Sequence, residues 1–77
     1  MLTGHQRVAL LRAGITVEAC GDDTILFIGE CAMFCAVERD DGLHDPYSGY
    51  GEPVAVDRLR SAVREIVDLK CWTPPSC

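Results

Sequence analysis

The sequence lacks the short motifs that identify common enzyme chemistries. Its 77 residues contain no P-loop, no dinucleotide-binding glycine fingerprint, no Gly-x-Ser-x-Gly elbow and no His-Glu-x-x-His pair. They also contain no Cys-x2-Cys pair, the usual beginning of a zinc site. Because each of these chemistries needs its residues at a fixed spacing, we expect a protein that is not an enzyme and that binds no metal or cofactor.

Long apolar segments and targeting signals are also missing. No stretch approaches the roughly 18 apolar residues that a membrane-spanning helix needs, and the first residues lack the pattern of a secretory signal. We therefore expect a soluble, cytoplasmic protein without membrane contact. In a reducing compartment the odd number of cysteines is expected to remain as free thiols, and these are Cys20, Cys31, Cys35, Cys71 and Cys77.

Basic residues are scarce in the middle of the chain. Residues 15–52 hold nine acidic residues against one base, Arg39, whereas residues 1–14 and 53–77 carry net charges of +2 and +1. The whole chain has a net charge of −5. Such a segment repels nucleic acid and attracts basic protein surfaces. The charge pattern therefore favours a protein partner over direct nucleic-acid binding.

The remaining composition is typical of one folded domain over residues 1–77. Hydrophobic residues make up 48% of the chain and charged residues 25%, as in globular proteins rather than disordered tails. At this length a single core barely offsets the entropy of the chain. We therefore expect a small domain of low stability.

The pattern of apolar residues predicts a helix followed by a three-stranded antiparallel meander. Thr3 is a suitable N-cap and Gly14 a suitable C-terminal residue for the helix. The period of the apolar residues then changes to two, as in strands, and turn residues at 21–23 and 29–30 separate the strands. The expected bounds are 4–13 for the helix and 15–20, 24–28 and 31–38 for the strands.

Residues 30–40 leave two alternatives open. The Gly29-Glu30 pair suits a two-residue hairpin turn, which favours a strand. Glu, Ala and Met favour a helix instead, and Gly42 is placed to end it. We take the strand as the prediction.

The second half of the chain predicts a loop, a helix and a tail. Glycines and Pro46 indicate an irregular surface loop over 41–53. An amphipathic pattern predicts a second helix over about 57–70, with Asp57 as N-cap and with a solvent-facing side that carries Arg58, Arg60 and Arg64. Trp72, in an extended tail over 71–77, is expected to fold back on the core. The predicted fold class is α+β.

The turns also predict which residues share a face of the sheet. A two-residue turn at Gly29-Glu30 places Ile28 opposite Cys31. Phe27 and Phe34 then lie on an uncharged inner face that meets the helices. The outer face holds a polar edge strand and two apolar strands, and it is either ordinary surface or a contact surface for a partner or a second copy.

In such a meander the first turn and the segment after the third strand lie at the same end of the sheet. The acidic residues of these segments should therefore form a rim of carboxylates that attracts a basic partner. Turn aspartates also have a simpler role in local backbone hydrogen bonding. A Tyr-Ser-Gly loop beside the rim is expected to supply contact area. The candidate partner-binding residues are Asp22, Asp23, Asp40, Asp41, Asp45, Tyr47 and Tyr50.

Two other classes of function remain open. One is a cytosolic thiol or metal-binding module using Cys20, Cys31 and Cys35. Residues four apart on a strand are separated by about 13 Å, so Cys31 and Cys35 share a zinc ion only if residues 30–40 are helical. A nucleophilic thiol would pair Cys35 with His44 or His5. The other class is a small homodimeric regulatory domain, and we expect a monomer or a weak homodimer.

The chain resembles, in general character, the small acidic inhibitors encoded by phages, the anti-CRISPR proteins in particular. The resemblance rests on size, on the pairs Asp22-Asp23 and Asp40-Asp41, and on the missing catalytic motifs. It covers no defined motif and transfers no residue. It implies a partner that is a basic, nucleic-acid-binding subunit of a CRISPR effector, blocked sterically or by mimicry of phosphate.

Overall fold

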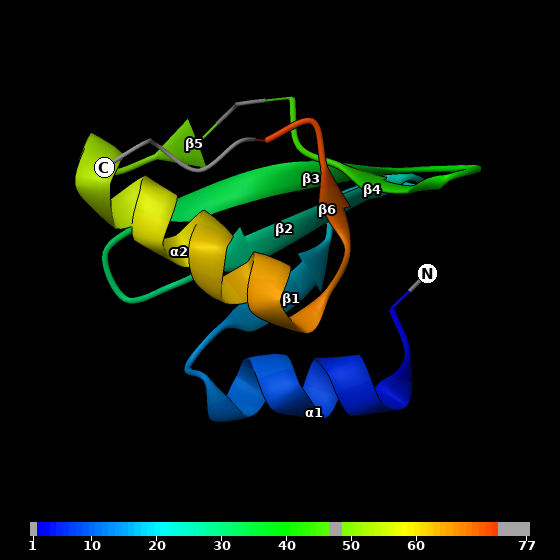
Figure 1. Ribbon diagram of the computed structural model, residues 1–77, viewed down its shortest axis with the longest axis horizontal. Coiled ribbons are helices and arrows are strands. Elements are labelled where there is room, and N and C mark those ends of the chain that lie inside the picture. Colours follow the sequence, from blue (N-terminus) through cyan, green and yellow to red (C-terminus); the bar gives the residue numbers. More distant parts are fainter. Residues whose placement is uncertain (1, 47–48, 73–77) are drawn as a thin grey trace.

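Two helices pack on one face of a mixed β-sheet in the computed structural model, which describes residues 2–46 and 49–72 (Figure 1). Strands lie in the order β1-β2-β3-β4-β6, and β5 also pairs with β3. This confirms the α+β class. The elements are α1 (Gly4–Arg12), β1 (Thr16–Ala19), β2 (Thr24–Ile28), β3 (Met33–Arg39), β4 (Gly42–His44), β5 (Gly49–Tyr50), α2 (Pro53–Ile66) and β6 (Leu69–Lys70).

The first helix begins and ends where the sequence predicts. The Thr3 hydroxyl accepts a hydrogen bond from the Gln6 N–H at 3.1 Å, and the Gln6 side chain accepts one from the Thr3 N–H at 2.9 Å. This reciprocal pair is a capping box. Gly14 follows with φ +80, a left-handed conformation that glycine adopts without steric cost. Leu10 is fully buried and attaches the helix to the core.

The three-stranded meander forms, with one change in register. The β1–β2 pairing matches the prediction, but in the β2–β3 pair Ile28 faces Met33 and not Cys31. The connection is longer than the predicted two residues, since the Gly29 N–H donates to the Ala32 carbonyl at 2.8 Å. A shift of two residues keeps every side chain on its face. Phe27 and Phe34 are therefore buried as expected, with their ring centroids 5.1 Å apart.

The predicted irregular loop over 41–53 is wrong in two places. Residues 42–44 form β4, which pairs antiparallel with β3 and parallel with β6. The turn into β4 ends at Gly42, whose φ of +128 favours glycine. Leu43 pairs with Leu69, and both are buried. Residues 49–50 form β5 against the beginning of β3.

The second helix lies earlier in the chain than predicted. It begins at Pro53, with Glu52 and not Asp57 as N-cap; proline suits this position because the first helical N–H has no intrahelical acceptor. The helix ends at Ile66, where Val67 takes an extended conformation, and residues 69–70 then pair with β4. Trp72 is 4% exposed, so the expected return of this side chain to the core is confirmed. Its carbonyl accepts a hydrogen bond from Arg64 at 2.6 Å.

Arg60 is buried, contrary to the prediction of a solvent-facing side chain. Its guanidinium makes a bidentate ion pair with Asp45: Nε donates to one carboxylate oxygen, and Nη2, the second donor, lies 3.3 Å from the other. The guanidinium carbon also lies 5.4 Å from the centroid of the Phe34 ring. Asp45 has no exposed surface and Arg60 is 6% exposed. A pair this deeply buried depends on both partners, since either charge alone would be costly to desolvate.

Candidate functional site

Four exposed carboxylates lie at one end of the sheet, and we call this surface the acidic end: Asp22, Asp23, Asp40 and Asp41. The first two belong to the β1–β2 turn and the others to the β3–β4 turn. The two turns are neighbours because the Glu38 N–H donates to the Asp23 carbonyl at 2.6 Å. Local strand pairing therefore brings both acidic pairs to one end.

Basic residues border this acidic surface. A pocket of about 260 Å³ beside Asp22 and Asp23 is also lined by Arg7 of α1 and by Glu38. Arg39 precedes the second acidic turn and is exposed. The acidic end is thus a cluster of carboxylates with cations at its edge.

Three predicted site residues lie elsewhere or outside the described part of the chain. Asp45 is buried against Arg60, so its predicted place in an exposed rim is wrong. Tyr50 is 74% exposed but pairs with Met33, at the opposite end of β3 from the acidic end. At about 3.3 Å per residue, the length of β3 separates Tyr50 from the acidic end by roughly 20 Å. Tyr47 lies outside the described residues.

The outer face of the sheet carries a continuous set of half-buried apolar side chains on β2 and β3. Both helices pack on the other face (Figure 1), so no helix of the described residues covers this one. The set begins beside the acidic end and follows both strands away from it. Its members are Leu26, Ile28, Met33, Cys35 and Val37.

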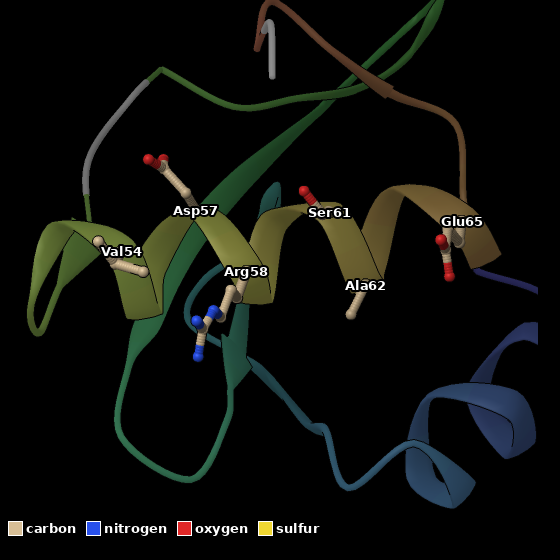
Figure 2. Close-up of a pocket in the computed structure, with 6 residues that line it drawn as sticks. All are labelled: Val54, Asp57, Arg58, Ser61, Ala62 and Glu65. Atoms are coloured by element: carbon tan, nitrogen blue, oxygen red, sulfur yellow. The ribbon is translucent and has the colours of Figure 1, made fainter. Parts of the chain in front are cut away.

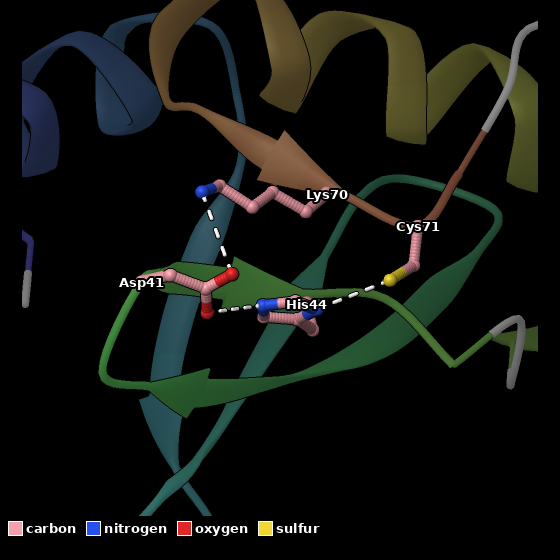
Figure 3. A network of polar contacts seen from close by, with 4 residues as sticks. All are labelled: Asp41, His44, Lys70 and Cys71. Atoms are coloured by element: carbon pink, nitrogen blue, oxygen red, sulfur yellow. Dashed lines mark hydrogen bonds and ion pairs between the residues drawn. The ribbon is translucent and has the colours of Figure 1, made fainter.

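A polar network joins the acidic end to the last described strand (Figure 3). His44 Nε2 lies 2.6 Å from Asp41 Oδ1, and His44 Nδ1 lies 3.1 Å from Cys71 Sγ. Lys70 Nζ is 3.7 Å from the other Asp41 oxygen. The sequence pattern pairs His44 with Cys35, but in the structure the sulfur beside His44 is that of Cys71. No short-range pattern indicates this contact, because it depends on the parallel β4–β6 pair between distant segments.

The hydrogen bond from His44 lowers the pKa of Asp41, with smaller contributions from the charges of His44 and Lys70. A carboxyl whose pKa is lowered by folding stabilises the fold above its ordinary pKa and loses that contribution as the pH falls through the lowered value. We expect the His44→Ala variant to raise the Asp41 pKa towards 3.8. An NMR titration of the side-chain carboxyl carbon measures this shift. His5→Ala, on α1, is the control, and an unchanged Asp41 pKa in His44→Ala would contradict the assignment.

A groove of about 450 Å³ runs along α2 (Figure 2). All of its lining residues come from this helix, and they carry charges of both signs beside the exposed Val54. A groove on one helix does not bring groups from several elements to a common point. The groove is therefore a weaker candidate for a site than the acidic end or the network at Cys71.

The cysteines are dispersed. Cys20, Cys31, Cys35 and Cys71 are free thiols, and Cys77 lies outside the described residues. Residues 33–39 are a strand, so the helical alternative that would have joined Cys31 and Cys35 at one metal is wrong. Within residues 2–46 and 49–72 no group of three or more metal-ligating side chains is found, and no helix there is both long and apolar enough to cross a bilayer.

The fold and the two surface features define a small α+β domain with an acidic end and a Cys-His-Asp network. No protein-family model matches the chain, and comparisons with curated proteins and with solved structures also give no match.

Proposed function

We propose that this protein is a small acidic inhibitor that binds a basic surface of another protein with its acidic end. The observation that carries the proposal is the convergence of two acidic turns, whose exposed carboxylates lie at one end of the sheet. A net charge of −5 adds long-range attraction to a basic partner. Clustered carboxylates also resemble the charge of a phosphate backbone, so a nucleic-acid-binding surface is the preferred partner.

The outer sheet face supplies the contact area in this proposal. Charge directs encounter, but the lifetime of a complex depends more on buried apolar contacts. Val37 and Cys35 begin an apolar surface next to the acidic end, whereas Tyr50 lies too far away. A partner that covers both surfaces would bury carboxylates at one edge and apolar side chains at the centre, as in typical protein interfaces.

Within this class we propose a CRISPR effector subunit as the partner. The support is the resemblance in size and acidic character to anti-CRISPR inhibitors, together with the carboxylates at one end of the sheet. Such a subunit presents a basic channel for nucleic acid, which the acidic end would occupy in place of phosphate.

The test is the association rate with a purified effector subunit at two salt concentrations. Neutralising Asp22, Asp23 and Asp40 to Asn should slow association by about tenfold at low salt, and should reduce its salt dependence. Asp41 is left in place because it contacts His44 and Lys70. The matched control neutralises three exposed acids away from the acidic end, Glu30, Glu52 and Glu65, to Gln.

Equal slowing by both triple variants would show that net charge acts without a defined site and would contradict the proposal. If the parent protein does not bind the effector subunit, that subunit is not its partner. Sedimentation of the free protein tests the rival occupant of the outer face: a stable dimer that Val37→Asp dissociates would assign that face to a second copy.

A further inference from the structure

Asp41, His44 and Cys71 form a line in which one imidazole lies between a carboxylate and a thiol (Figure 3). The distances are 2.6 Å on the carboxylate side and 3.1 Å on the sulfur side. A thiol nucleophile, a base beside it and a carboxylate that orients the base are the three groups that together activate a thiol.

The backbone of three segments builds this line. Asp41 lies in the turn before β4, and His44 is the last residue of that strand. Lys70 pairs with His44 across the parallel β4–β6 ladder, and its carbonyl accepts the Asp45 N–H at 2.9 Å. Cys71 follows this pair with φ +69, a conformation that is uncommon for residues other than glycine. The sulfur is thus brought to His44 by a strand pairing and an unusual backbone conformation.

The partners determine where the imidazole proton lies. An ionised carboxylate only accepts hydrogen bonds, so His44 Nε2 carries the proton and donates it to Asp41. In the neutral ring Nδ1 is then an acceptor, and it faces the Cys71 thiol. When the thiol proton moves to Nδ1, the resulting imidazolium lies between a thiolate and the Asp41 carboxylate, and both anions stabilise it.

We propose that Cys71 is a reactive thiol, activated by His44 as base and by Asp41 as positioning residue, and that it exchanges with small disulfides. Cys71 is exposed and lines none of the grooves described above, which suits a reaction that needs only an open sulfur. The proposal goes beyond the binding function and does not depend on it.

The reaction with glutathione disulfide balances as follows. The Cys71 thiolate attacks one sulfur, a bond forms between Cys71 and that glutathione, and the original S–S bond breaks. The departing glutathione thiolate takes the proton held by His44. Cys71 is oxidised to a mixed disulfide, and one glutathione leaves reduced.

The first experiment measures alkylation of each cysteine in the folded protein by iodoacetamide, resolved by peptide mass spectrometry. We expect Cys71 to react roughly tenfold faster than the exposed thiols Cys20 and Cys31. His44→Gln should lower the Cys71 rate to that of Cys20 without changing Cys20 itself. His5→Gln is the matched control and should change neither rate.

Two further measurements separate the base, the positioning residue and the reaction. Asp41→Asn should lower the Cys71 rate, and Asp41→Glu should restore part of it, a recovery that a purely structural role does not predict. Glutathione disulfide should modify Cys71 before the other cysteines. Equal rates for Cys71 and Cys20, a Cys71 rate unaffected by His44→Gln, or fast alkylation without a mixed disulfide would each overturn the proposal.

Discussion

Asp45→Ala is expected to destabilise the fold by about 3–5 kcal/mol, because it leaves the Arg60 guanidinium buried without its carboxylate. Small domains have a free energy of unfolding of only about 5–15 kcal/mol. A large fraction of the Asp45→Ala molecules should therefore be unfolded near physiological temperature. Thermal unfolding followed by circular dichroism measures the effect. A loss of about 1 kcal/mol moves the midpoint of a domain this size by roughly 4–8 °C.

The control for Asp45→Ala is Asp40→Ala, which removes an exposed carboxylate and should change stability by no more than about 0.5 kcal/mol. The double change Asp45→Leu with Arg60→Met removes both charges and should recover most of the loss, since apolar replacement of a buried pair is often neutral. Equal melting of Asp45→Ala and the parent would show that the ion pair is not buried in solution.

Phe34→Ala is expected to cost on the order of 3–5 kcal/mol, as truncation of a buried aromatic residue does. Phe34 is 1% exposed and stacks on Phe27, and the Arg60 guanidinium lies over its ring. Urea unfolding measures the free energy. Leu11→Ala, at a residue 69% exposed on α1, is the matched truncation and should cost little.

Phe34 and Asp45 share Arg60 as a neighbour, so their two effects should not add. A double-mutant cycle between Phe34→Ala and Asp45→Ala should give a coupling free energy outside experimental error. If Phe34→Ala melts within a degree or two of the parent protein, Phe34 does not lie in the core, and the face of the sheet that carries it is the exposed one.

The local parts of the fold could be predicted from sequence. Alternation with a period of two assigned Phe27 and Phe34 to the core even though the register was wrong by two residues, because side chains two apart share a face. The capping residue Thr3 was equally local. What failed was the loop between β3 and α2, where Asp40 and Asp41 form a two-residue turn and Gly42 already pairs with Arg39. The glycines and Pro46 of this segment favoured irregular backbone instead.

The features of the candidate sites also divide into those that follow from local sequence patterns and those that depend on contacts between distant segments. The convergence of Asp22-Asp23 with Asp40-Asp41 follows from hairpin topology, which short-range patterns reveal. The contacts of Asp45 with Arg60 and of His44 with Cys71 join segments distant in the chain. The spacing of residues along the chain does not indicate such contacts. Arg60 is a charged residue on an amphipathic helix, and such residues ordinarily lie on the solvent side.

The parallel pairing of β6 with β4 also bears on local unfolding. The β1–β2–β3 hairpins join neighbouring segments, whereas β6 pairs with β4 across the whole of α2, so this contact carries a larger entropic cost of loop closure. When β6 detaches, Leu43 lies on an open strand edge of the kind that other chains pair with. The same detachment separates Cys71 from His44, so the exposure of this edge and the loss of the Cys71 contact are coupled.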